Sequence, residues 1–196
     1  MFSLLDYSIN STLQLSFVCI QQQDNVGLLT FERNINTFFQ AAGGMSQIHK
    51  FREALYAEST EFAQSDYSAL FSFCQRNIKK RSLLIIYTQF DSVNSLNRQM
   101  PYIKELAKLH LVLIVFFIDS DIQQLCYQSP SEMSTVDKPM TGTEVYATQM
   151  VAQLMSFEQH QIVRELKKHG IFSLLTSPES LTVNVINQYL ALKERI

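Results

Sequence analysis

The stretch that decides the fold is Arg81-Ser-Leu-Leu-Ile-Ile-Tyr-Thr-Gln-Phe-Asp91. It contains an apolar run, 83–87, that is followed by the polar pair Thr88 and Gln89. A strand that is buried on both faces has a continuous apolar sequence, so the run predicts a strand in the middle of a parallel sheet. In open parallel α/β sheets, ligands bind at the carboxyl ends of the strands. Thr88, Gln89 and Asp91 are therefore expected at the position where a functional site would lie.

Apolar runs and helical periodicities alternate on both sides of this stretch. The predicted strands are 26–31, 35–39, 83–88, 111–118 and 171–175. The predicted helices are 4–22, a segment beginning near residue 45, 67–79, 92–109, 119–127, 143–169 and 182–194. This alternation predicts one α/β domain over residues 1–196, with a doubly wound, mostly parallel sheet in which 35–39 is an edge strand. The chain opens on a helix, although the first strand of a doubly wound sheet is normally central.

Two features interrupt the regular pattern. Pro101 falls inside the predicted helix 92–109 and should kink it or divide it in two. Residues 128–142 are rich in serine, threonine, proline and glycine, and they are predicted to form a surface loop.

Composition excludes several classes of protein. The chain is 46% hydrophobic and 17% charged with a net charge of −2, which favours neither nucleic-acid binding nor an anionic membrane surface. The longest apolar run, 111–118, is too short to span a membrane. Cys19, Cys74 and Cys126 are far apart and lie in apolar-periodic stretches, which is typical of reduced, buried thiols in a cytoplasmic protein.

No complete catalytic set is visible. His49 and His160 lie on polar helix faces, whereas His110 and His169 end helices, where a charged imidazole would interact favourably with the helix dipole. Gly43-Gly44 lacks the lysine and hydroxyl residue of a phosphate-binding loop, and no GxSxG nucleophile motif is present. We therefore predict that the protein is not an enzyme.

Several segments together resemble the domain-of-unknown-function 58 family, in its Bacteroidetes branch, which carries a von Willebrand factor A-like domain. The segments are Asp6-Tyr7-Ser8-Ile9-Asn10, residues 24–31, Ser65-Asp66-Tyr67, residues 81–90, Val115-Phe116-Phe117, Glu179-Ser180-Leu181-Thr182 and Asn187-Gln188-Tyr189-Leu190. They cover nearly the whole chain in the family's order.

The family pattern places a strand and a metal-binding motif before the helix that begins near Leu5. Since this chain contains neither, the resemblance implies that it is the C-terminal part of a longer protein or that its start codon is misplaced. A full-length protein would then be membrane-anchored through a segment outside this cytoplasmic part. Strands 26–31 and 83–88 should either flank an empty slot or pair directly with each other.

The resemblance also implies a degenerate metal site. Complete von Willebrand A-like domains hold Mg²⁺ with a DxSxS motif, a threonine and an aspartate, because this ion prefers oxygen ligands. Here the DxSxS motif is absent, the threonine-bearing loop corresponds to Ser65-Asp66, and the aspartate position falls on the neutral Gln89. Asp91 lies two residues further on, and the remaining oxygens do not complete a site. We therefore expect no metal or other cofactor in this chain, and Ser65 or Asp66 has a simpler role as a helix N-cap.

Two functional hypotheses remain. The first is a non-enzymatic interaction module that docks a protein at the carboxyl ends of the strands; the resemblance implies a MoxR-type AAA+ ATPase as the partner. The alternative is an α/β hydrolase or nucleotide-binding protein that uses the same rim as a pocket. Thr88 and Gln89 carry no titratable group, which favours docking. The predicted rim residues are Ser65, Asp66, Thr88, Gln89, Asp91 and Asp119, of which Asp119 is also explained by helix capping.

Overall fold

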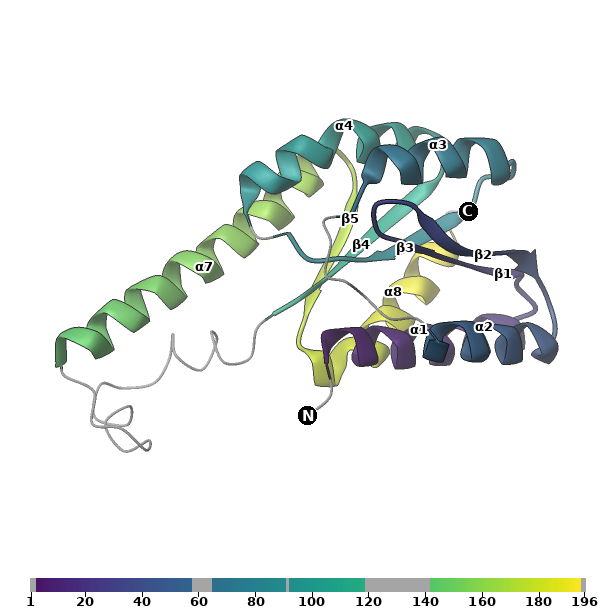
Figure 1. Ribbon diagram of the computed structural model, residues 1–196, viewed down its shortest axis with the longest axis horizontal. Helices are drawn as coiled ribbons and strands as arrows, with labels where there is room; N and C mark the ends of the chain where they lie inside the picture. The colour runs from purple at the N-terminus through teal and green to yellow at the C-terminus, as the bar shows by residue number, and fades with distance from the viewer. Residues whose placement is uncertain (1–2, 58–64, 91, 119–141, 195–196) are drawn as a thin grey trace.

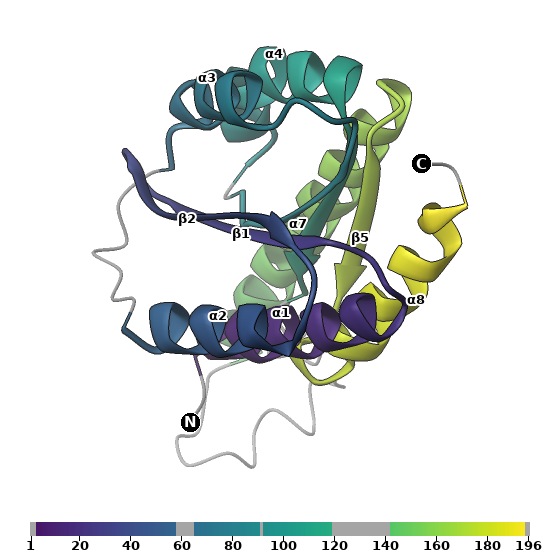
Figure 2. The same ribbon diagram turned by 90° about the vertical axis from the view of Figure 1, so that its right-hand side faces the viewer.

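The structure, a computed structural model, describes residues 3–57, 65–90, 92–118 and 142–194. These residues form a layer of strands between two layers of helices (Figures 1 and 2). One helix layer contains α1 (Leu4–Gln21), α2 (Met45–Ala57) and α8 (Leu181–Lys193), the last preceded by the short 3-10 helix η1 (Pro178–Ser180). The other helix layer contains α3 (Tyr67–Asn77), α4 (Val93–Leu109) and α7 (Gly142–Lys168).

The strands form two separate sheets. β3 (Leu83–Tyr87), β4 (Leu111–Phe117) and β5 (Phe172–Thr176) form a parallel sheet in the order β3-β4-β5. β1 (Val26–Phe31) and β2 (Ile35–Ala42) form an antiparallel hairpin. The α/β class is therefore confirmed, and the parallel sheet flanked by helices is compatible with a Rossmann-like fold.

The core is built on β4, the central strand of the parallel sheet. Every residue from Val112 to Phe117 is at most 5% exposed. Val112, Ile114 and Phe116 pack among α3, α4 and α7, and the alternate residues pack against α1 and α8. Because successive side chains of a strand point to opposite faces, one apolar run joins both helix layers. Each buried side chain of this size contributes about 1.5–3 kcal/mol.

β3 differs from its prediction as a central strand. It is an edge strand of the three-stranded sheet, and Ile86, at 8% exposed, is its one fully buried residue. The amide of Thr88 donates to the carbonyl of Val115, and the amide of Leu111 donates to the carbonyl of Ser82. Since backbone groups alternate in direction along a strand, the even-numbered residues of β3 face β4. The odd-numbered residues face the other side, where no described strand is paired with β3.

The hairpin belongs to the same layer as the parallel sheet. Leu29 and Phe31 of β1 contact the core that lies under α3 and α4, whereas Leu28 packs with Phe51 beside α1 and α2. The hairpin thus has helices on both faces, as the parallel sheet does. No ladder joins β1 to β3 within the described residues, so the direct pairing that we considered is not found there.

Two predicted boundaries need correction. α4 continues through the exposed Pro101, so of the two predicted outcomes, a kink or a division, the division does not occur. Gly142, predicted as the end of the loop 128–142, is the first residue of α7. The rest of that loop and the predicted helix 119–127 lie outside the described residues.

The N-terminal half of α7 extends beyond the sheet (Figure 1). The side-chain amide of Gln159 lies 3.5 Å from the carbonyl oxygen of Phe117, the last residue of β4. This contact places Gln159 level with the carboxyl edge of the sheet. The residues before it therefore project past that edge, over a length of about 25 Å at 1.5 Å per residue. No helix in the described part of the chain is long and apolar enough to cross a membrane.

The free edge of β3 leads to a prediction for amide hydrogen exchange. The amides of Leu84, Ile86 and Thr88 should exchange slowly, because they face β4, and those of Leu83, Ile85 and Tyr87 should exchange faster, because they face the unpaired side. Residue-resolved exchange measured by NMR tests this alternation. Equal protection of both sets would show that a further strand pairs with β3.

Candidate functional site

The carboxyl edge of the sheet is organised around Gln89. Its side-chain oxygen accepts a hydrogen bond from the amide of Phe117 at 3.2 Å, and its side-chain nitrogen donates to the carbonyl of the same residue at 3.4 Å. A carboxamide carries the same donor and acceptor as a peptide group. Gln89 therefore provides one further rung of the ladder between β3 and β4, after the backbone bond from Thr88 to Val115.

Thr88 and Asp66 are joined through Tyr67. Asp66 is the N-cap of α3, where its carboxylate accepts hydrogen bonds from the amides of Ser68 and Ala69 at 2.8 and 3.2 Å. The next residue, Tyr67, donates its hydroxyl hydrogen to the Thr88 hydroxyl at 2.8 Å. Burial raises the pKa of Tyr67 to about 12, with the Thr88 hydrogen bond opposing the shift, so that this hydroxyl stays protonated at neutral pH.

The aromatic ring of Tyr67 lies between two other rings. It meets Phe31 of β1 edge to face at a centroid distance of 5.6 Å, and it stacks on Phe90 at 5.8 Å. Such ring pairs fix geometry and stabilise beyond the area that they bury. Tyr67 thus connects the hairpin, α3 and the end of β3 at one point of the carboxyl edge.

The structure brings most of the described rim residues together, but in structural roles. Thr88, Gln89 and Asp66 each have partners within the fold, and Ser65 is half-buried next to Asp66. Asp91 and Asp119 lie outside the described residues. Among the residues that are described, no three histidine, cysteine, aspartate or glutamate side chains gather where they could hold a metal ion. The edge therefore presents mainly neutral groups that are already hydrogen-bonded.

Exposed apolar side chains of α7 lie beside the carboxyl edge and form a wall there. Val151 and Met155 lie on the same side of α7 as the buried Ile162 and Leu166, since residues seven and eleven apart share a helix face. The latter two reach the core, whereas Val151 and Met155 lie beyond the end of β4 and are 55% and 47% exposed. We call Val151 and Met155 the inner stripe. The sequence predicted one apolar face made of Val151, Leu154, Phe157, Ile162 and Leu166, but Leu154 and Phe157 are exposed and lie off the core-facing side. Nothing in the sequence indicated that the helix would be longer than the sheet.

A second polar cluster lies at the end of α1, where α8 also ends. The Tyr189 hydroxyl donates to the Asp24 carboxylate, and the Lys193 ammonium lies 2.8 Å from the same carboxylate. Although desolvation acts to raise the pKa of Asp24, the hydrogen bonds from Lys193 and Tyr189 lower it overall. The cluster fastens the loop after α1 to α8, and we assign it a structural role.

His110 requires a correction. It is the C-cap residue of α4, as the sequence suggested, but it is 3% exposed rather than a charged group in solvent. Among the residues that the structure describes, neither ring nitrogen has a hydrogen-bond partner. Burial lowers the pKa of His110 below its usual 6.5, because desolvation disfavours the charged imidazolium. The predicted interaction of a charged imidazole with the helix dipole is therefore not its role.

Comparison with known proteins identified no similar protein. No protein-family model matches the chain, and no curated protein or solved structure is found to be similar to it.

Replacing Gln89 tests its role as a rung of the ladder. The change Gln89→Leu should lower the free energy of unfolding by about 1–2 kcal/mol, because it leaves the amide of the buried Phe117 without a partner. Urea denaturation measures the change, with the exposed Gln75→Leu as the matched control. Gln89→Asp should also destabilise, since a carboxylate cannot donate to the Phe117 carbonyl, and should not create a Mg²⁺ site. Tight Mg²⁺ binding by that variant would contradict our interpretation.

The buried imidazole predicts how stability depends on pH. The folded state holds His110 neutral, whereas the unfolded chain binds a proton below about pH 6.5, so stability should decrease as the pH falls through that value. His110→Leu should remove this part of the pH dependence, and the exposed His49→Leu is the matched control. Melting curves between pH 7.5 and 5, a window of about one unit above to one and a half below the usual pKa, compare the three proteins. Parallel curves for wild type and His110→Leu would refute the assignment.

Proposed function

We propose that the chain is a non-enzymatic protein-interaction module that docks a partner at the carboxyl edge of the β3-β4-β5 sheet, against the inner stripe of α7. The observation that carries the proposal is the exposure of Val151 and Met155 on the core-facing side of a helix that has passed the end of the sheet. Apolar side chains in that position form a side wall above the edge. A docked protein would bury them.

The polar groups below that wall support docking rather than chemistry. Gln89 and Asp66 hold backbone groups, and Thr88 accepts the Tyr67 hydroxyl hydrogen. A rim whose side chains are already bonded is rigid, and a rigid surface loses little entropy on binding. The alternative of an α/β hydrolase or nucleotide-binding protein needs titratable groups in mutual reach at this edge, and no specific observation favours it.

The finer fold and the partner follow from the resemblance to the domain-of-unknown-function 58 family. We infer a von Willebrand factor A-like arrangement, in which the hairpin continues the layer of the parallel sheet on the free side of β3. The separate β1-β2 hairpin, covered by helices on both faces, supports this arrangement. The family resemblance makes a MoxR-type AAA+ ATPase the partner, and the docking needs no metal ion held by this chain.

Binding of the purified chain to a MoxR-type AAA+ ATPase, measured by biolayer interferometry, tests the proposal. The double change Val151→Glu with Met155→Glu places two charges on the inner stripe and should weaken binding at least about tenfold, equivalent to 1.4 kcal/mol. Val183→Glu is the matched control, because Val183 is 62% exposed on α8, away from the wall. A wild-type chain that does not bind, or a double variant that binds equally well, would overturn the proposal.

A further inference from the structure

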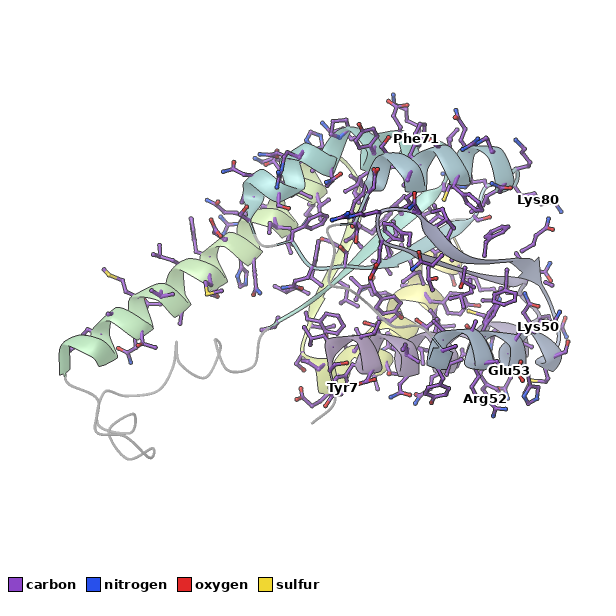
Figure 3. All side chains as sticks on the ribbon, in the orientation of Figure 1. Tyr7, Lys50, Arg52, Glu53, Phe71 and Lys80 are labelled. Carbon is purple, nitrogen blue, oxygen red and sulfur yellow. The ribbon has the colours of Figure 1, made fainter. Side chains whose placement is uncertain are left out.

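The projecting half of α7 carries a second apolar surface. Tyr146, Met150, Leu154 and Phe157 are between 54% and 69% exposed. Their spacing of four, four and three residues places them along one side of the helix. We call these four residues the outer stripe. Figure 3 shows side chains along this part of α7 that point away from the rest of the molecule.

The outer stripe lies on the opposite side of α7 from the core. At about 100° per residue, its centre is turned by roughly 145° from the side that carries the buried Ile162 and Leu166. Most of it therefore faces away from the carboxyl edge, although Leu154, at its margin, lies about 60° from Val151 of the inner stripe. Toward the C-terminus, the exposed Arg164 ends the apolar surface on this side. An exposed helix normally has polar residues opposite its core face, so an apolar stripe at this position indicates an interface.

The chemistry of the stripe narrows the choice of partner. Residues 145–157 contain no aspartate, glutamate, lysine, arginine or histidine. A charged partner would therefore find no opposite charge along this surface, and an anionic membrane would find no cation. A second copy of the same stripe meets it with no like-charge repulsion and with matching apolar side chains.

The exposed apolar area of the outer stripe can be compared with the area that a stable dimer buries. Aromatic side chains present about 150–250 Å² each, so the exposed fractions of these two aromatic and two aliphatic side chains leave on the order of 500 Å² per chain. The flanking Ala147 and Gln153 are also exposed and enlarge the surface. A stable interface of standard size buries roughly 800 Å² per partner. Two such stripes, with their flanks, approach that size.

From these observations we propose that the outer stripe is a homodimer interface, in which two copies of α7 pack antiparallel about a two-fold axis. An axis midway between Met150 and Leu154 places Met150 of one copy against Leu154 of its partner, and Tyr146 against Phe157. The same patch is then used by both copies, as a closed two-fold dimer requires. The two sheets lie at opposite ends of the helix pair, and both carboxyl edges stay accessible. This interface uses other residues than the docking site proposed above, and the two surfaces adjoin where Leu154 lies beside Val151.

Sedimentation velocity of the whole chain, over concentrations from micromolar to near millimolar, tests the dimer. The wild type should sediment as a dimer that dissociates on dilution. Leu154→Glu should raise the dimer dissociation constant at least about a hundredfold, because each copy would press a carboxylate against the Met150 of its partner. Val183→Glu introduces the same charge at an equally exposed valine of α8 and should leave the dissociation constant unchanged.

A second measurement separates loss of the interface from loss of the fold. Circular dichroism should give Leu154→Glu the same helix content as the wild type, since Leu154 is 62% exposed. A wild-type chain that stays monomeric at the highest concentration would overturn the proposal. So would a dimer that persists unchanged in Leu154→Glu, because its interface would lie elsewhere.

Discussion

The burial of β4 on both faces is the constraint on which the rest of the structure depends. Leu113, Ile114 and Val115 are completely inaccessible to solvent, and their side chains alternate between the two helix layers. Such a strand must have a neighbour on each side and a helix layer on each face, because its backbone polar groups and its apolar side chains both leave water. α4 before β4 and α7 before β5 cover one face together with α3, and α1 and α8 cover the other face.

The same constraint explains the carboxyl edge. β3 ends at Tyr87, two residues before the ladder would reach Phe117, whose side chain is 5% exposed. The amide and carbonyl of Phe117 therefore need partners that the β3 backbone no longer supplies. Gln89 satisfies both with one side chain. An aspartate is shorter and only accepts hydrogen bonds, so a metal ligand at this position would leave the carbonyl without this donor. The neutral amide is thus explained by the fold, whatever the ancestry of the site.

The sequence predicted the local elements closely, because they depend on periodicity and capping within a few residues. The bounds of α1, of β1 and of α8 agree with it to within one residue, and Asp66 caps α3 as expected. The predictions that proved wrong concern roles that depend on contacts between residues far apart in the sequence. The apolar run of β3 is the same whether a strand is central or at an edge. His110 follows a helix end in the sequence, and its burial becomes visible only with the tertiary structure.

α7 is another element whose role could not be predicted from local sequence alone. Its apolar residues satisfy the periodicity of a core-facing helix, and the C-terminal half uses them in that way, with Leu166 fully buried. The helix is longer than the sheet that it covers, and its apolar pattern continues past the sheet, where Ala152 is buried but the large apolar side chains around it are exposed. There Met155 lies on the core-facing side of the helix, and the exposed Phe157 lies roughly 160° around the helix from it. A helix that is apolar on more than one side is expected to be buried by other protein surfaces on those sides. In this chain the two sides differ in what they adjoin: one borders the rim of the sheet, and the other borders solvent. This difference is the reason to assign them to different partners.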